Sequence, residues 1–87
     1  MKIIYTRQLL KDLEVLEPQI SLKIQQYIEA LKVADNISSV RKMRKMVGYK
    51  NYYRLRFWEY RLWIKLENNT ALMKRFKLRK DIYKVFP

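Results

Sequence analysis

The stretch from residue 52 to residue 83 carries most of the side chains that could do chemistry. Its segments YYRLRF, YRLWIKL and RFKLRKDIY place arginine, lysine and tyrosine at short intervals among hydrophobic residues. Guanidinium groups hold phosphate oxygens in bidentate geometry, and phenol and amine groups can exchange protons. This set of groups suits the binding of a phosphodiester and the stabilisation of the charge that develops during its cleavage.

A site of this kind could cleave RNA without supplying a nucleophile, because the 2′-hydroxyl of RNA can attack the adjacent phosphorus. A protein has to align that hydroxyl, accept its proton, stabilise the phosphorane oxygens and protonate the leaving oxygen. Free tyrosine and lysine have pKa values of about 10, and neighbouring cations lower such values. A basic cluster can therefore help to activate its own proton acceptor.

The composition argues against other catalytic plans. The chain contains no histidine and no cysteine, so it lacks the usual general base, the usual nucleophilic thiol and the thiolate ligands of metal sites. Clustered carboxylates for a two-metal nuclease and glycine-rich phosphate loops are also missing from the sequence. We expect a site that uses no metal ion and no cofactor.

The net charge of +12 belongs to one half of the chain. Residues 1–37 contain five basic and five acidic residues, whereas residues 38–87 contain fifteen basic and three acidic residues. This asymmetry indicates an anionic partner: nucleic acid, an acidic membrane surface or an acidic protein. No segment approaches the roughly 20 apolar residues of a membrane span and no signal peptide is recognisable, so we expect one cytoplasmic domain over residues 1–87.

The first half predicts a strand followed by a helical hairpin. Residues 2–5 should form the strand, Thr6 is expected as an N-cap, and leucines at helical spacing predict a helix over residues 7–16. Pro18 suits the first turn of a second helix. The apolar stripe of that helix consists of Ile20, Ile24, Tyr27, Ile28 and Leu31.

The second half predicts antiparallel strands with one hydrophobic and one cationic face. A two-residue turn at Trp58 and Glu59 would pair Arg56 with Arg61, although neither turn residue favours the positive φ that such turns require. Residues on the cationic face would be Arg54, Arg56, Arg61, Trp63 and Lys65, and residues on the core face would include Tyr53, Leu55 and Phe57.

The segment before this hairpin is strongly basic. Residues 40–46 hold four cations and no acidic residue, after an expected loop over residues 34–39. Gly48, the only glycine of the chain, predicts a backbone position with positive φ.

The next turn has two possible geometries. A two-residue turn at Asn68 and Asn69 would direct three later cations toward the core, whereas an odd loop or a bulge would reverse the faces. Burying three unpaired cations is prohibitive, so we expect the odd loop. The core face would then carry Leu72, Phe76 and Leu78, with Lys74 as a misfit.

These motifs, in this order, resemble the RelE/ParE superfamily of toxins from type II toxin–antitoxin systems. The resemblance is carried by GYKNYYRLR from Gly48 to Arg56, by Arg61 after the hairpin, and by RKDIYK from Arg79 to Lys84. It covers nearly the whole chain. It implies an α+β fold in βααβββ order, with a helical hairpin on one face of a small, mainly antiparallel sheet and a short C-terminal helical turn.

The RelE branch, as the resemblance implies, cleaves mRNA in the ribosomal A site with basic residues and a tyrosine and inhibits translation. The implied catalytic residues are Arg54, Arg56, Arg61, Arg79 and Tyr83. Arg61 would contact phosphate, Arg79 would assist the leaving group, and Tyr83 would stack on or orient the substrate. Further contacts to substrate or ribosomal RNA are expected from Lys42, Arg44, Lys45, Lys50, Trp63, Lys77 and Lys80.

The chain departs from the family pattern at two positions whose residues, in the RelE branch, assist proton abstraction and stabilise the phosphate. Arg54 and Arg56 stand where the RelE branch has lysines, and arginine stays protonated. Either the activity is weaker, or Tyr83 or Lys77 transfers the proton.

The ParE branch offers a different function, because it inhibits DNA gyrase by binding and is not a nuclease. The set of four arginines and one tyrosine favours the RelE branch. The implied partners are the 70S ribosome with its mRNA and an acidic antitoxin, which we expect to be partly disordered and to fold over the helical hairpin or the basic face.

Overall fold

The computed structural model describes residues 1–34 and 40–85. Its elements are β1 (Lys2–Tyr5), α1 (Arg7–Glu14), α2 (Pro18–Ala30), η1 (Leu31–Val33), β2 (Met43–Lys45), β3 (Tyr52–Phe57), β4 (Tyr60–Glu67), β5 (Thr70–Leu78) and α3 (Arg79–Val85). The expected loop over residues 34–39 lies, apart from Ala34, outside the described residues. The α+β class is confirmed, and β2 is a strand that the sequence did not predict.

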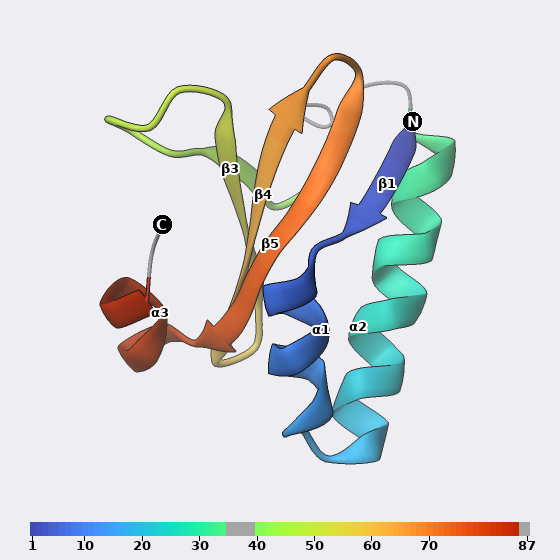
Figure 1. The fold of residues 1–87 in the computed structure, drawn as a ribbon, viewed down its shortest axis with the longest axis vertical. Coiled ribbons are helices and arrows are strands. Elements are labelled where there is room, and N and C mark those ends of the chain that lie inside the picture. Colours follow the sequence, from blue (N-terminus) through green and yellow to red (C-terminus); the bar gives the residue numbers. More distant parts are fainter. Residues whose placement is uncertain (35–39, 86–87) are drawn as a thin grey trace.

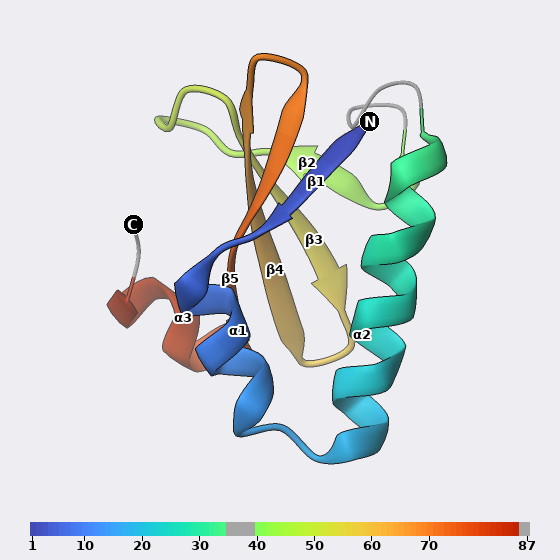
Figure 2. The same cartoon turned by 45° about the vertical axis from the view of Figure 1, so that its right-hand side comes forward.

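The strands form one sheet in the order β1-β5-β4-β3-β2. β1 runs parallel to β5, and the other neighbours are antiparallel. The hairpin of α1 and α2 covers one face, which we call the helical face, and α3 lies against the opposite face, which we call the open face (Figure 1). Rotation shows α1 beside β5 and α2 beside β3 (Figure 2). No helix among the described residues is long and apolar enough to cross a membrane.

The ends of the helices follow local chemistry. The Thr6 hydroxyl accepts a hydrogen bond from the Leu9 amide at 3.3 Å, so the expected N-cap of α1 is confirmed. α1 ends at Glu14, two residues earlier than expected. Pro18 begins α2 and forces Glu17 into an extended conformation with ψ of 141°, which separates the two helices.

The hydrophobic core lies between the helical face and the two helices. It includes most of the apolar stripes that the sequence predicts, because those positions recur at helical spacing in α2 and at every second position in β3. Its buried residues are Leu9, Leu13, Ile24, Ile28, Leu31, Met43, Leu55, Leu62, Ile64, Ala71, Met73 and Phe76.

The β3–β4 hairpin has the expected register. Arg56 pairs with Arg61 and Arg54 pairs with Trp63, which confirms the two-residue turn at Trp58 and Glu59. Trp58 adopts a φ of 55°, a conformation that a bulky side chain disfavours. The alternation of cations and hydrophobes therefore fixes the pairing even though the turn residues are poor choices.

The expected odd loop between β4 and β5 is wrong, although the expected position of Phe76 is right. Asn68 and Asn69 form a two-residue turn with φ values of 47° and 61°, which suits asparagine. The reversal of faces comes from a bulge at Lys74, since Ile64 pairs with Met73 and Trp63 pairs with Arg75.

The bulge divides β5 into two parts with opposite alternation. Before it, Ala71 and Met73 face the core, so Leu72 lies on the open face instead of the expected core face. After it, Phe76 faces the core. Thr6 covers the bulge by donating a hydrogen bond from its hydroxyl to the Met73 carbonyl at 2.6 Å.

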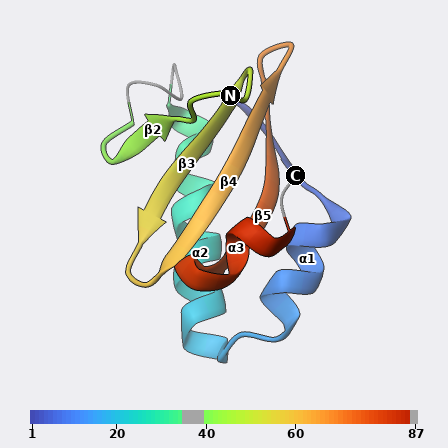
Figure 3. The same cartoon turned by 90° about the vertical axis from the view of Figure 1, so that its left-hand side faces the viewer.

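Trp63 is placed on the open face as expected but is not accessible there. It is 1% exposed and packs in a second hydrophobic cluster with Met46 and Ile82, next to Tyr52. Figure 3 shows the reason, because α3 lies across this part of the open face with the sheet behind it. The indole therefore serves packing, and it is not accessible for the contact to substrate or ribosomal RNA that the sequence predicts for it.

Candidate active site

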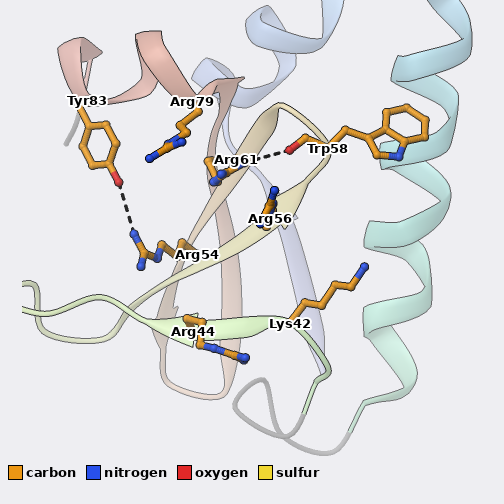
Figure 4. Close-up of a pocket in the computed structure, with 8 residues that line it drawn as sticks. All are labelled: Lys42, Arg44, Arg54, Arg56, Trp58, Arg61, Arg79 and Tyr83. Atoms are coloured by element: carbon orange, nitrogen blue, oxygen red, sulfur yellow. Dashed lines mark hydrogen bonds between the residues drawn. The ribbon is translucent and has the colours of Figure 1, made fainter.

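A cationic pocket of about 730 Å³ occupies the open face. Four elements contribute to it: the start of β2, strand β3, the first residues of β4 and helix α3 (Figure 4). We call it the cationic pocket, and its lining residues are Lys42, Arg44, Arg54, Arg56, Trp58, Arg61, Arg79 and Tyr83.

Strand pairing places like charges directly opposite one another in this pocket. Arg44 pairs with Arg54 across β2 and β3, and Arg56 pairs with Arg61 across β3 and β4. Like charges at opposed positions destabilise a sheet. Among residues 1–34 and 40–85, no acidic residue lines the cationic pocket, so a bound anion is the natural counter-charge.

Arg61 is held in place by the turn that precedes it. Its Nη1 donates hydrogen bonds to the carbonyl oxygens of Trp58 at 3.1 Å and Tyr60 at 2.9 Å. Burial lowers the pKa of the Arg61 guanidinium from its ordinary value, and the positive charges of Arg56 and Arg79 lower it further. The guanidinium is thus oriented and surrounded by cations, as a phosphate-binding group should be.

Helix α3 is attached to the same turn. The backbone amide of Arg79 donates a hydrogen bond to the Glu59 carbonyl at 2.8 Å. This bond brings the start of α3 to the end of the β3–β4 hairpin. As a result Arg79 reaches the pocket beside Arg61, although 18 residues separate them in the sequence.

Tyr83 closes one side of the cationic pocket. Its hydroxyl accepts a hydrogen bond from Arg54 Nη1 at 3.4 Å, and its ring packs edge-on against Trp63 at 5.3 Å between centroids. The side chain is nevertheless 59% exposed. The buried indole of Trp63 therefore supports the ring of Tyr83, while the Tyr83 hydroxyl remains accessible to a ligand.

The pocket brings together the five residues expected to be catalytic, and Lys42 and Arg44 of the expected binding residues. Lys45, Lys50 and Lys80 are exposed but do not line it. Lys77 also lies outside the lining, because its Nζ is 3.6 Å from the Asp12 carboxylate. The pairing with a buried carboxylate argues against Lys77 as the proton-transfer group.

Sequence reasoning missed Trp58, which lines the cationic pocket and is 56% exposed. The available signal was a conflict: a bulky aromatic residue occupied a turn position that requires positive φ. Residues that break a local rule of this kind concentrate at functional sites.

The chemistry of the pocket is restricted by its residue types. Arginine remains protonated, so the lining groups that can exchange a proton are Tyr83 and Lys42. Among residues 1–34 and 40–85, no three carboxylates, histidines or cysteines gather at metal-binding distance. The arrangement can bind an oxyanion at several points and exchange a proton at its edge.

Comparison with known proteins gives one sequence relative and several related folds. Toxin RelE3 of Methanocaldococcus jannaschii is 32% identical over 88 residues, covering the whole of both chains. The RelB–RelE antitoxin–toxin complex from Methanococcus jannaschii contains a chain that is 30% identical, with a TM-score of 0.81 over 97% of this chain and 99% of that one. No protein-family model matches.

A more distant structure has the same fold. The archaeal RelE–RelB complex from Pyrococcus horikoshii OT3 contains a chain with a TM-score of 0.72 at 18% identity, over 90% of this chain and 93% of that one. Similarity at this level concerns the fold alone.

Proposed function

The chain belongs to the RelE family of toxins from type II toxin–antitoxin systems, and from this premise we propose that it is a ribosome-dependent mRNA endonuclease. The observation that supports the proposal most is the cationic pocket, where the four expected arginines and Tyr83 line one cavity. These residues come from three separate elements. A surface that merely kept the protein soluble would have no reason to gather them.

The phosphate of the scissile bond would lie among the guanidinium groups. Arg61, fixed by two carbonyl oxygens, would bind the non-bridging oxygens and stabilise the phosphorane. Arg56, which pairs with Arg61 across β3 and β4, and Arg79, at the start of α3, add positive charge around Arg61. The 2′-hydroxyl of the preceding nucleotide attacks the phosphorus, the bond to the 5′-oxygen breaks, and a cyclic phosphate and a 5′-hydroxyl result.

Proton transfer in this mechanism falls to Tyr83 or Lys42. Tyr83 is the better candidate, because its hydroxyl accepts a hydrogen bond from Arg54 and is exposed to the pocket. As a phenolate, Tyr83 would accept the proton of the 2′-hydroxyl, and Arg54 would hold its oxygen in place. Arg79 would stabilise the 5′-oxygen that leaves, and Lys42 or a water molecule would supply the proton that completes the 5′-hydroxyl.

An antitoxin is the second proposed partner. The solved structures described above are complexes of RelE with RelB, and this chain has a net charge of +12 that an acidic protein would neutralise. Expression of the chain alone should stop growth, and co-expression of its cognate antitoxin should restore it. Harmless expression of the folded protein would contradict the toxin function.

Primer extension on a translated mRNA tests the nuclease proposal. The expected result is cleavage inside codons that appears only when ribosomes translate the message. A DNA gyrase supercoiling assay should be run with the same protein preparation. Inhibited supercoiling with intact mRNA would overturn the proposal in favour of the ParE-like function.

A further inference from the structure

A second cavity, of about 510 Å³, lies between α2 and β3 and adjoins the cationic pocket. The two cavities share Lys42, Arg56 and Trp58. The indole of Trp58 points away from the arginines and toward α2 (Figure 4). We call this cavity the aromatic groove, and its other lining residues are Lys23, Gln26, Tyr27, Leu55 and Phe57.

Trp58 presents a flat, accessible ring in this groove. Trp58 is 56% exposed. Lys23 Nζ lies over its ring, 4.9 Å from the centroid, and the centroid of the Phe57 ring lies 5.1 Å from that of Trp58. An accessible aromatic ring beside cations is the usual platform on which proteins stack an unpaired base. Gln26 adds an amide that can both donate and accept hydrogen bonds at a base edge.

The backbone conformation provides an independent argument. Among the described residues, five non-glycine residues have positive φ, and three of them are asparagines, which tolerate it. The other two are Lys42, with φ of 72°, and Trp58, with φ of 55°. Both line both cavities, so the strained conformations occur where the cavities meet, as expected of a functional site.

Charge identifies the occupant. Lys23, Lys42 and Arg56 surround the aromatic rings, so a purely apolar peptide segment would bury cations without compensation. A nucleotide matches both the aromatic rings and the cations of the groove, because its base is flat and its phosphate is anionic. We propose that the aromatic groove binds an unstacked base of the RNA strand, one or two nucleotides from the phosphate held in the cationic pocket. This inference rests on the proposed function.

Binding of an RNA that cannot be cleaved tests the subsite separately from catalysis. The probe is a fluorescein-labelled tetranucleotide with 2′-O-methyl groups throughout, which removes the attacking hydroxyl. Tryptophan fluorescence should be quenched when the same tetranucleotide binds without its label, and loss of the quenching in Trp58→Asn assigns it to Trp58, since Trp63 is buried. Replacing the base that binds in the aromatic groove by an abasic residue should abolish the quenching and weaken binding about tenfold.

Trp58→Asn is the informative variant, because asparagine suits the positive φ and removes the ring. It should melt at the same temperature as the wild type or higher, yet bind the probe about tenfold more weakly by fluorescence anisotropy. Trp58→Phe should keep most of the affinity. Leu22→Ala serves as the control, since Leu22 is exposed on α2 and lies outside the groove.

Three results would overturn the inference. Equal affinity of wild type and Trp58→Asn is one, and absence of quenching at millimolar probe is another. The third is a variant that loses antitoxin binding but keeps RNA binding, which would assign the groove to the protein partner. The nuclease proposal fails differently, through intact translated mRNA, because the uncleavable probe reports base binding whether or not the protein cuts RNA.

Discussion

The guanidinium groups of the cationic pocket differ in what holds them. Arg61 donates to two backbone carbonyls of its own turn, whereas Arg54 donates to a tyrosine hydroxyl. A group fixed by backbone is suited to hold a phosphate in one geometry. A group that donates to a titratable side chain can instead respond to the loss of that side chain's proton.

Replacing Tyr83 by phenylalanine tests which group accepts the proton. Removal of a general base lowers the rate by about 100-fold or more, while the ring, and hence its contact with Trp63, is kept. Single-turnover cleavage of ribosome-bound mRNA measures the change. Tyr49→Phe is the control, because Tyr49 is exposed and lies outside the cationic pocket. Unchanged cleavage by Tyr83→Phe would transfer the role to Lys42.

At the scale of the elements, Asp12 connects α1 to β5. Its carboxylate is 3% exposed and accepts hydrogen bonds from Arg75 Nε at 2.9 Å, Arg75 Nη2 at 3.0 Å and the Phe76 amide at 3.0 Å. The carboxylate thereby compensates a partly buried guanidinium and satisfies a backbone donor of β5, next to the bulge at Lys74.

Asp12→Ala should therefore destabilise the fold strongly. It leaves Arg75 partly buried without its counter-charge and should cost about 3 kcal/mol of unfolding free energy. Urea denaturation measures the loss. Glu14→Ala, an exposed position on the same helix, should change the free energy of unfolding by less than about 0.5 kcal/mol. Equal stability of the two variants would contradict the structural role of Asp12.

The hydrogen bond between Tyr5 of β1 and Glu29 of α2 should make the stability of the fold depend on pH. Burial raises the pKa of Tyr5 to about 12, and the hydrogen bond from its hydroxyl to Glu29, at 3.0 Å, adds to the effect. Because the folded pKa exceeds the unfolded value of about 10, this stabilisation is present below pH 10 and disappears as the pH rises toward 12. Tyr5→Phe should lose less stability than the wild type between those pH values. Parallel stability curves for the two proteins would argue against the link.

The register of β3 and β4 could be predicted because the five residues from Tyr53 to Phe57 alternate between hydrophobe and cation, so Arg56 had one sensible partner in Arg61. Strand β2 could not be predicted, since three residues with only Met43 facing the core are too short to show a period. The bulge at Lys74 was not predictable either, because it breaks the alternation on which the argument depends.

The burial of Trp63 shows a different limit of prediction from the sequence. Its position on the open face followed from alternation, but its exposure depended on α3, which packs there through Ile82. Seven of the twelve expected site residues line the cationic pocket. Lys77 had the right residue type but does not line the pocket, because its Nζ lies 3.6 Å from the Asp12 carboxylate, a tertiary contact that residue type does not specify.

For the whole molecule, the excess charge makes RNA binding sensitive to salt. Each neutralised phosphate of a single strand contributes a slope of about −0.7 to the logarithmic salt dependence of the affinity. With three phosphates bound, the affinity for the uncleavable tetranucleotide should fall roughly 20-fold between 50 and 200 mM salt. Arg56→Ala should make the slope shallower by about 0.7. A salt-independent affinity would show that the pocket does not hold phosphates.

Cleavage of translated mRNA by Arg61→Ala tests the central claim most directly, because the positive charges of Arg56 and Arg79 act on Arg61, which is fixed by two carbonyl oxygens. Arg7→Ala, at an exposed position on α1, removes the same charge from a residue that does not line the pocket. We predict that Arg61→Ala keeps its unfolding curve and loses at least about 100-fold in cleavage rate, whereas Arg7→Ala cleaves as the wild type does. Full cleavage by folded Arg61→Ala would contradict the account.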